Sequence, residues 1–169
     1  MPFRRACASK SMAGPASHFN KPMTAKKILI IEDNVMNLEM ATDLLEASGF
    51  EVFSAPSAEE GIRLAQVVSP NLVLMDIGLP GMDGLSATVA LRASPITRHL
   101  TLVGFSAHAM TGDMEIALRA GCDGYVIKPI DTRNFVDTVK RFIEKGHVPP
   151  KPRTPAKGAP VEIRRNGFG

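Results

Sequence analysis

Five side chains with the chemistry to bind a metal or a phosphate lie at the ends of short apolar runs: Glu32, Asp33, Asp76, Ser106 and Lys128. Three of these groups are carboxylates, one is a hydroxyl and one is an ammonium. Two like charges about 4 Å apart cost on the order of 4 kcal/mol at an effective dielectric of 20, so a cluster of carboxylates needs a counterion. Mg²⁺, a hard cation that prefers oxygen ligands, is the most economical one.

The same set lacks the parts of two common hydrolytic sites. It contains no Ser-His pairing, and it has no general base with room for a water in the manner of a glycosidase. A metal, a lysine, a hydroxyl and one protruding carboxylate suit phosphoryl transfer, which requires mainly positioning and neutralisation of the equatorial oxygens. Asp76 is the candidate for the protruding carboxylate, because an apolar run leads directly into it.

The elements that must position these groups alternate along the chain. Short apolar runs bounded by turn signals predict strands at 27–31, 51–54, 72–75, 101–105 and 124–127. Helical spacing of apolar residues predicts helices between and after them. The residues that indicate these helices are Val35, Leu38, Ala41 and Leu45; Ser57 and Glu60 as a capping box before Ile62, Leu64, Ala65 and Val68; 85–92; 114–120; and Phe135, Val139, Phe142 and Ile143.

Five strand-helix units in alternation predict an α/β fold with a parallel sheet and helices on both faces, because each right-handed crossover returns the chain in the same direction. Ligands of such sheets bind beyond the carboxyl ends of the strands. The three carboxylates, Ser106 and Lys128 are therefore expected at one edge of the sheet.

Four segments carry a family resemblance, in order and spacing: IIEDN, LVLMDIGLPGMDG, FSAHAM and GYVIKPI. With them, residues 26–145 resemble the receiver domain of two-component response regulators. The nearest types are the chemotaxis single-domain regulator and the standalone cell-division regulators of alphaproteobacteria. The resemblance implies a doubly wound, flavodoxin-like, five-stranded parallel sheet with strand order 2-1-3-4-5.

The resemblance also implies the roles of the acidic residues. Asp76 would accept a phosphoryl group from a phosphohistidine and become an acyl phosphate. Glu32 and Asp33 would hold Mg²⁺ together with Asp76 and the backbone carbonyl of Gly78. Gly78 departs from many family members because it offers no side chain two residues after the acceptor.

Four further positions match the family pattern. Lys128 would pair with a phosphoryl oxygen, and Ser106 would move in to hydrogen-bond another. Tyr125 occupies the position of the switch aromatic, whose ring turns inward when the hydroxyl moves. Pro129 matches the family's proline, which implies a cis Lys128–Pro129 bond.

The resemblance implies a single-domain switch rather than an enzyme. Its partners would be a histidine kinase or histidine phosphotransfer protein and a downstream protein target, and it would be a monomer or weak dimer. One alternative is an aspartate-dependent phosphohydrolase of the haloacid-dehalogenase type, but such enzymes place an acid where this chain has Gly78. A second alternative is a DNA-associated regulator that uses its basic ends, although no specific nucleic-acid motif accompanies them.

Charge divides the chain into an acidic body and basic ends. Residues 1–27 carry six Lys/Arg and no acid, whereas residues 28–145 carry nine Lys/Arg against sixteen acids. We predict a disordered basic arm or leader at 1–25, a receiver domain at 26–146 and a Pro-rich basic tail at 147–169. No apolar run approaches the roughly 18 residues of a membrane span, so we expect no membrane partner and a cytoplasmic location.

The remaining candidates are given structural interpretations. Turn chemistry accounts for Asp83 in GMDG. Cys122 is expected as a small buried residue, because two cysteines with no ligand spacing indicate neither a disulfide framework nor a metal site. His108 could influence attack of water on the acyl phosphate, but an exposed residue at a helix start is favoured. The other histidines are interpreted as surface residues: His18, His99 and His147.

Overall fold

The computed structural model of the chain describes residues 24–107 and 111–149, which form five strands and five helices. The strands are β1 (Lys27–Ile31), β2 (Glu51–Ala55), β3 (Leu72–Asp76), β4 (Thr101–Ser106) and β5 (Gly124–Ile127). All neighbouring pairs are parallel, and the order across the sheet is β2-β1-β3-β4-β5. The predicted α/β class and strand order are confirmed.

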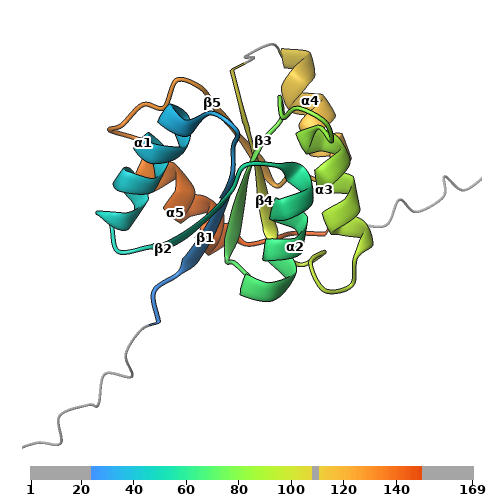
Figure 1. The fold of residues 1–169 in the computed structure, drawn as a ribbon, viewed down its shortest axis with the longest axis horizontal. Coiled ribbons are helices and arrows are strands. Elements are labelled where there is room, and N and C mark those ends of the chain that lie inside the picture. Colours follow the sequence, from blue (N-terminus) through green and yellow to red (C-terminus); the bar gives the residue numbers. More distant parts are fainter. Residues whose placement is uncertain (1–23, 108–110, 150–169) are drawn as a thin grey trace, which may run out of the picture.

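The helices cover both faces of this sheet, as Figure 1 shows. They are α1 (Val35–Glu46), α2 (Ala58–Val68), α3 (Gly84–Ala93), α4 (Thr111–Ala120) and α5 (Phe135–Lys145). Helices α1 and α5 lie on one face, and α2, α3 and α4 lie on the other. The described helices include none long and apolar enough to cross a membrane.

Two buried clusters explain why the sheet is wound on both sides. Ile28 and Ile30 of β1 pack with residues of α1 and α5, whereas Leu29 and Ile31 pack with residues of α2 and α3. Successive side chains of a strand point to opposite faces, so one apolar run supplies both clusters. All four side chains are fully buried, which is why these runs contain no polar alternation.

Side-chain oxygens begin three of the helices. Asn34 accepts a hydrogen bond from the backbone N–H of Asn37 at 3.1 Å, and Ser57 accepts one from Glu60 at 3.3 Å. Asp83 accepts from the N–H of Ser86 at 2.8 Å and from its hydroxyl at 2.9 Å. Each acceptor satisfies an N–H that has no partner within the helix. The predicted start at Ser57 is thus confirmed, and the turn aspartate Asp83 is a helix cap.

Helix α1 differs from the prediction in one respect. Ala41 and Leu45 are buried and Leu38 packs against them, but Val35 is 64% exposed. Val35 is the first residue of the helix, and burial starts only one turn later. The expectation that Val35 shares the buried face is therefore wrong.

Candidate functional site

The ends of four strands bring the chemically active side chains to one edge of the sheet. Asp76 and Ser106 are the last residues of β3 and β4, and Glu32 and Lys128 directly follow β1 and β5. Because the strands are parallel, all of these positions lie at the carboxyl edge. Asp33 is also there and is exposed, whereas Glu32, Asp76 and Ser106 are each at most 6% exposed.

Lys128 bridges two of the carboxylates. Its Nζ lies 2.5 Å from Glu32 Oε2 and 2.9 Å from Asp76 Oδ2. The same ammonium lies 4.6 Å from the centre of the Phe105 ring, a cation–π distance. With its side chain only 11% exposed, Lys128 is held between a buried pair of negative charges and an aromatic face.

The surroundings of Glu32 shift the pKa of its carboxyl. Burial raises the pKa of its carboxyl above the usual range, the nearby Asp76 charge raises it further, and Lys128 opposes both effects. Oε1 accepts a hydrogen bond from the N–H of Asn34 at 3.1 Å. Oε2 is buried, and its contact among the described residues is the ion pair with Lys128.

The carboxylates fit a divalent cation. Glu32, Asp33 and Asp76 each present an oxygen, and these three oxygens lie within 4.8 Å of one another. Three carboxylates against the single ammonium of Lys128 leave a net charge of −2. A hard divalent ion would balance that charge, and it would give the buried Oε2 of Glu32 a ligand role. The donor set therefore suits Mg²⁺.

The loop after β3 fixes the orientation of Asp76. The backbone N–H of Gly78 donates to Asp76 Oδ1 at 2.9 Å, and the N–H of Gly84 donates to the carbonyl of Ile77 at 3.2 Å. A Cβ at Gly84 would lie 2.1 Å from the backbone oxygen of Asp76. Only glycine can begin α3 this close to the strand, so Gly84 is a packing requirement.

Ser106 and Tyr125 lie on the neighbouring strands β4 and β5, beside a small cavity. They line a cavity of about 230 Å³ together with Ile77, Leu85, Asp113 and Ile116. The backbone N–H of Lys128 donates to the carbonyl of Ser106 at 2.7 Å, which ties β5 to β4 at the site. The Lys128–Pro129 peptide bond is cis in the structure. His108 lies outside the described residues.

Sequence reasoning missed one polar cluster, at the other end of the sheet. His147, interpreted as a surface residue, is half-buried, and its Nδ1 lies 2.6 Å from Asp123 Oδ1. Arg92 donates to the other oxygen of Asp123 at 2.7 Å. The surface interpretation of His147 is therefore wrong. These three residues are 24 or more positions apart in sequence, so no spacing pattern could have identified them. Cys122 beside them is buried, as expected.

Comparison with known proteins identifies the family of this fold and site. The sequence pattern of the response regulator receiver domain matches residues 28–140. The chain is a member of that receiver family. Asp76, Glu32, Ser106 and Lys128 all lie within the matched range.

Individual receiver proteins support this assignment. The polar-differentiation response regulator DivK of Brucella ovis is 39% identical over 118 residues, which cover 70% of this chain and 96% of DivK. The receiver domain of the sensor histidine kinase PA1611 of Pseudomonas aeruginosa, whose structure has a magnesium ion in the active-site cleft, is 31% identical with a TM-score of 0.66. That match covers 71% of this chain and 98% of the PA1611 domain.

A third receiver shares the fold. The CheY-like receiver domain protein of Methanospirillum hungatei is 29% identical with a TM-score of 0.63, over 72% of this chain and 96% of its own. The chain is thus a receiver of two-component signalling, similar to a polar-differentiation regulator. The haloacid-dehalogenase alternative is not favoured by these matches.

Proposed function

We propose that Asp76 accepts a phosphoryl group from a phosphohistidine on a histidine kinase or a histidine phosphotransfer protein. The observation that carries this proposal is the placement of Asp76 at the end of β3, 2.9 Å from Lys128 Nζ and within 4.8 Å of two further carboxylates. In the transfer, the P–N bond of the phosphohistidine breaks and a P–O bond to the Asp76 carboxylate forms. The imidazole leaves with the electron pair of the broken bond.

The residues around Asp76 would position and neutralise the incoming group. The N–H of Gly78 holds Oδ1, and Lys128 holds Oδ2, so the carboxylate is oriented before the donor arrives. Lys128 would then pair with a phosphoryl oxygen. Fixed donors of this kind stabilise charge without having to reorganise during the reaction. Ser106, buried on the neighbouring strand, would donate its hydroxyl to another phosphoryl oxygen.

Glu32, Asp33 and Asp76 would hold Mg²⁺, with the backbone carbonyl of Gly78 as a further ligand. When bound, this ion supplies positive charge to the phosphoryl oxygens. The chain's own contribution is a set of carboxylates that is held together before the metal binds. Burial of Glu32 makes that set costly without a cation, which supports a resident metal.

Phosphorylation would act as a switch rather than begin a catalytic cycle with an external substrate. It adds a charge of about −1.5 to −2 beside Lys128 and favours one of two arrangements of Ser106 and Tyr125. The cavity of about 230 Å³ that both residues line provides space for such a rearrangement. The output would be an altered surface for a downstream protein, on a monomer or weak dimer.

The test is labelling with a small phosphodonor. Incubation of the full chain with acetyl phosphate and Mg²⁺ is expected to add one phosphoryl group, located on Asp76 by peptide mass spectrometry. Asp76→Asn should not be labelled, and chelation of Mg²⁺ should slow labelling of the wild type. Labelling of Asp76→Asn at the wild-type level would show that the acceptor is elsewhere. Circular dichroism of the variant checks that its fold is retained.

A further inference from the structure

A second hollow lies at the end of the sheet opposite the carboxylate site. Its volume is about 970 Å³, and it is formed by the ends of α3 and α4, the segment before β4, the turn before β5 and the residues after α5. The strands between the two sites are four to six residues long, at about 3.3 Å per residue. The hollow is therefore separate from the phosphorylation site and not used by the proposed mechanism.

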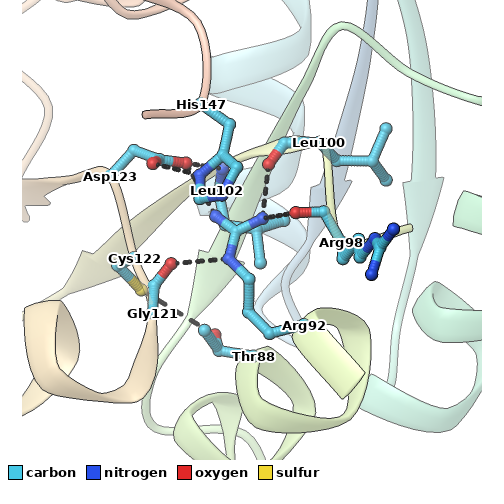
Figure 2. Close-up of polar contacts among 9 residues, drawn as sticks. All are labelled: Thr88, Arg92, Arg98, Leu100, Leu102, Gly121, Cys122, Asp123 and His147. Carbon is cyan, nitrogen blue, oxygen red and sulfur yellow. Dashed lines mark hydrogen bonds and ion pairs between the residues drawn. The ribbon is translucent and has the colours of Figure 1, made fainter. Parts of the chain in front are cut away.

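The hollow contains one carboxylate, and that carboxylate is already neutralised. Asp123 Oδ2 accepts from Arg92 Nη2 at 2.7 Å and from the backbone N–H of Leu102 at 2.9 Å. Its Oδ1 lies 2.6 Å from His147 Nδ1, and Figure 2 draws this contact as a dashed line. The Asp123 side chain is only 8% exposed. No unpaired negative charge of Asp123 therefore faces a ligand in the hollow.

Arg92 holds the wall of the hollow in place. Its Nε donates to the carbonyl of Gly121 at 2.8 Å, and its Nη1 donates to the carbonyls of Arg98 and Leu100 at 2.8 and 2.7 Å. These bonds join α3 to the turn before β5 and to the segment before β4 (Figure 2). Burial lowers the pKa of the Arg92 guanidinium, but the Asp123 charge opposes this effect, so the group stays cationic.

The rim supplies accessible positive charge. Arg98 and Arg119 line the hollow, and both are exposed. Arg119 lies 3.3 Å from Glu115, but both side chains are more than 60% exposed, so the pair contributes little and a ligand could replace it. Three arginines against one aspartate give the lining a net charge of +2, although residues 28–145 carry a net −7. A concave surface concentrates such a field.

The rest of the wall combines carbon surface with the imidazoles of His99 and His147. Leu118, Ala120 and Val148 contribute carbon surface, and burial raises the pKa of the Cys122 thiol, which keeps that group neutral. Pockets of roughly 300–1,000 Å³ with apolar walls and a few placed polar groups are typical of small-molecule sites. The combination indicates a ligand with one anionic end and one flat, weakly polar end.

We propose that this hollow binds a nucleotide, with its phosphates against Arg98 and Arg119 and its base against the apolar wall. Guanidinium groups bind phosphate oxygens in pairs and stack on planar rings. The chain's own segment 150–169 starts at this hollow, after Pro149, but it carries five Lys/Arg against one Glu. This positive charge disfavours the segment as the occupant of a positively charged hollow. The same charge would favour an anionic ligand nearby.

The test is titration of the full chain, in the presence of EDTA, with ADP, inorganic pyrophosphate and a poly-glutamate peptide. We expect ADP to bind with a dissociation constant in the micromolar to millimolar range. The double variant Arg98→Glu/Arg119→Glu should weaken ADP binding by about tenfold or more, equivalent to about 1.4 kcal/mol. Arg63→Glu, an exposed arginine on α2 outside the hollow, should leave ADP binding unchanged.

Each other result would overturn the proposal. One such result is the absence of ADP binding at millimolar concentration. Another is ADP binding that the double variant does not weaken, because the basic ends alone would then hold the anion. Pyrophosphate binding as tightly as ADP would exclude a role for the base. Tighter, variant-sensitive binding of poly-glutamate would assign the hollow to an acidic protein segment. The NMR signal of Val148 is also compared between two experiments, removal of residues 150–169 and addition of ADP. Matching shifts would identify the tail as the occupant of the hollow.

Discussion

At the scale of single residues, the balance of charge around Lys128 determines what the carboxylate site can do. One ammonium contacts Glu32 and Asp76, while the exposed Asp33 adds a third negative charge. In the metal-free state Lys128 therefore balances part of this negative charge. Buried ion pairs contribute little net stability, but the loss of one partner is expensive.

Replacement of Lys128 tests this balance. Lys128→Met keeps a long side chain but leaves Glu32 and Asp76 without their shared cation, so the free energy of unfolding in EDTA should fall by about 3 kcal/mol. Mg²⁺ should restore part of the loss. Urea denaturation with and without Mg²⁺ measures both effects, and Lys140→Met on the exposed face of α5 is the control. A variant as stable as wild type in EDTA would show that the ion pairs are not formed.

Gly84 permits the close contact between α3 and the end of β3. Gly84→Ala would place a Cβ 2.1 Å from the Asp76 backbone oxygen and 2.8 Å from Ile77 Cα, and backbone atoms cannot move aside cheaply. We expect a loss of about 3 kcal/mol in unfolding free energy and slower labelling by acetyl phosphate. Gly112→Ala in α4 has nothing within 4 Å and should stabilise by up to about 1 kcal/mol. Equal effects of the two substitutions on stability would show that the close contact at Gly84 does not matter.

At the scale of elements, the ends of the strands hold the candidate site residues, while the middles of strands and helices supply burial. Buried apolar runs end in Asp76 and Ser106, and helices α1 and α3 begin at the side-chain caps Asn34 and Asp83. Asp83 illustrates the arrangement, because its cap fixes the start of α3 directly beside the loop that holds Asp76. The ionisation of Asp83 is consequently a measurable part of the stability of this corner.

The cap at Asp83 predicts a pH dependence with a definite sign. The N–H and hydroxyl of Ser86 lower the pKa of the Asp83 carboxyl below its usual 3.8. The contribution of its charge is therefore complete above about pH 4 and is lost as the pH falls through the lowered pKa. At pH 7, Asp83→Ala should cost about 1 kcal/mol.

The matched variant for this cap is Asp83→Asn, which keeps an acceptor oxygen but cannot ionise. Urea denaturation at pH 7, 5 and 3 should show that the advantage of wild type over Asp83→Asn is small and decreases at the lowest pH. High salt should reduce that advantage as well, because Asp83 is exposed. An advantage that persists unchanged at pH 3 would mean that the charge plays no part.

The elements themselves could be predicted from local pattern, and their long-range contacts could not. Each strand was located to within one residue, because continuous apolar runs bounded by turns have few other interpretations. Helix α4 starts at Thr111, three residues before the predicted start, since Thr111 and Gly112 carry weak helix signals. Val35 was misplaced because helical spacing gives a face but not where along the helix burial begins.

The proximity of the carboxylate-site residues could be predicted from the sequence, whereas the contacts around the hollow could not. Parallel strands must end at one edge, so topology alone places Asp76, Ser106 and Lys128 together. The contacts of Arg92 and His147 with Asp123 depend on how α3 and the segment after α5 pack, which no local pattern encodes. A half-buried histidine in a Pro-rich segment has the same sequence signature as an exposed one.

At the scale of the whole molecule, charge is separated between the body and the ends. Residues 1–23 and 150–169 carry nine Lys/Arg against one acid, so their removal would change the net charge of the chain from +3 to −5. In the body, Lys128 contacts Glu32 and Asp76, and the backbone N–H groups of Asn34 and Gly78 donate to these two carboxylates. The contacts of the site in the body and the positive charge of the ends can therefore be tested separately.

Removal of both basic ends separates these two contributions. A chain of residues 24–149 should unfold with a free energy within about 0.5 kcal/mol of the full chain, because surface changes away from packed features have effects of this size. Its labelling by acetyl phosphate should also be unchanged. Retention on a cation exchanger at pH 7 and any salt-sensitive association with DNA should be lost. Slower labelling of the truncated chain would instead mean that the ends contribute to phosphorylation. Addition of a basic peptide in trans would then distinguish the two explanations: recovery of the labelling rate indicates an electrostatic contribution, and no recovery indicates a direct contact.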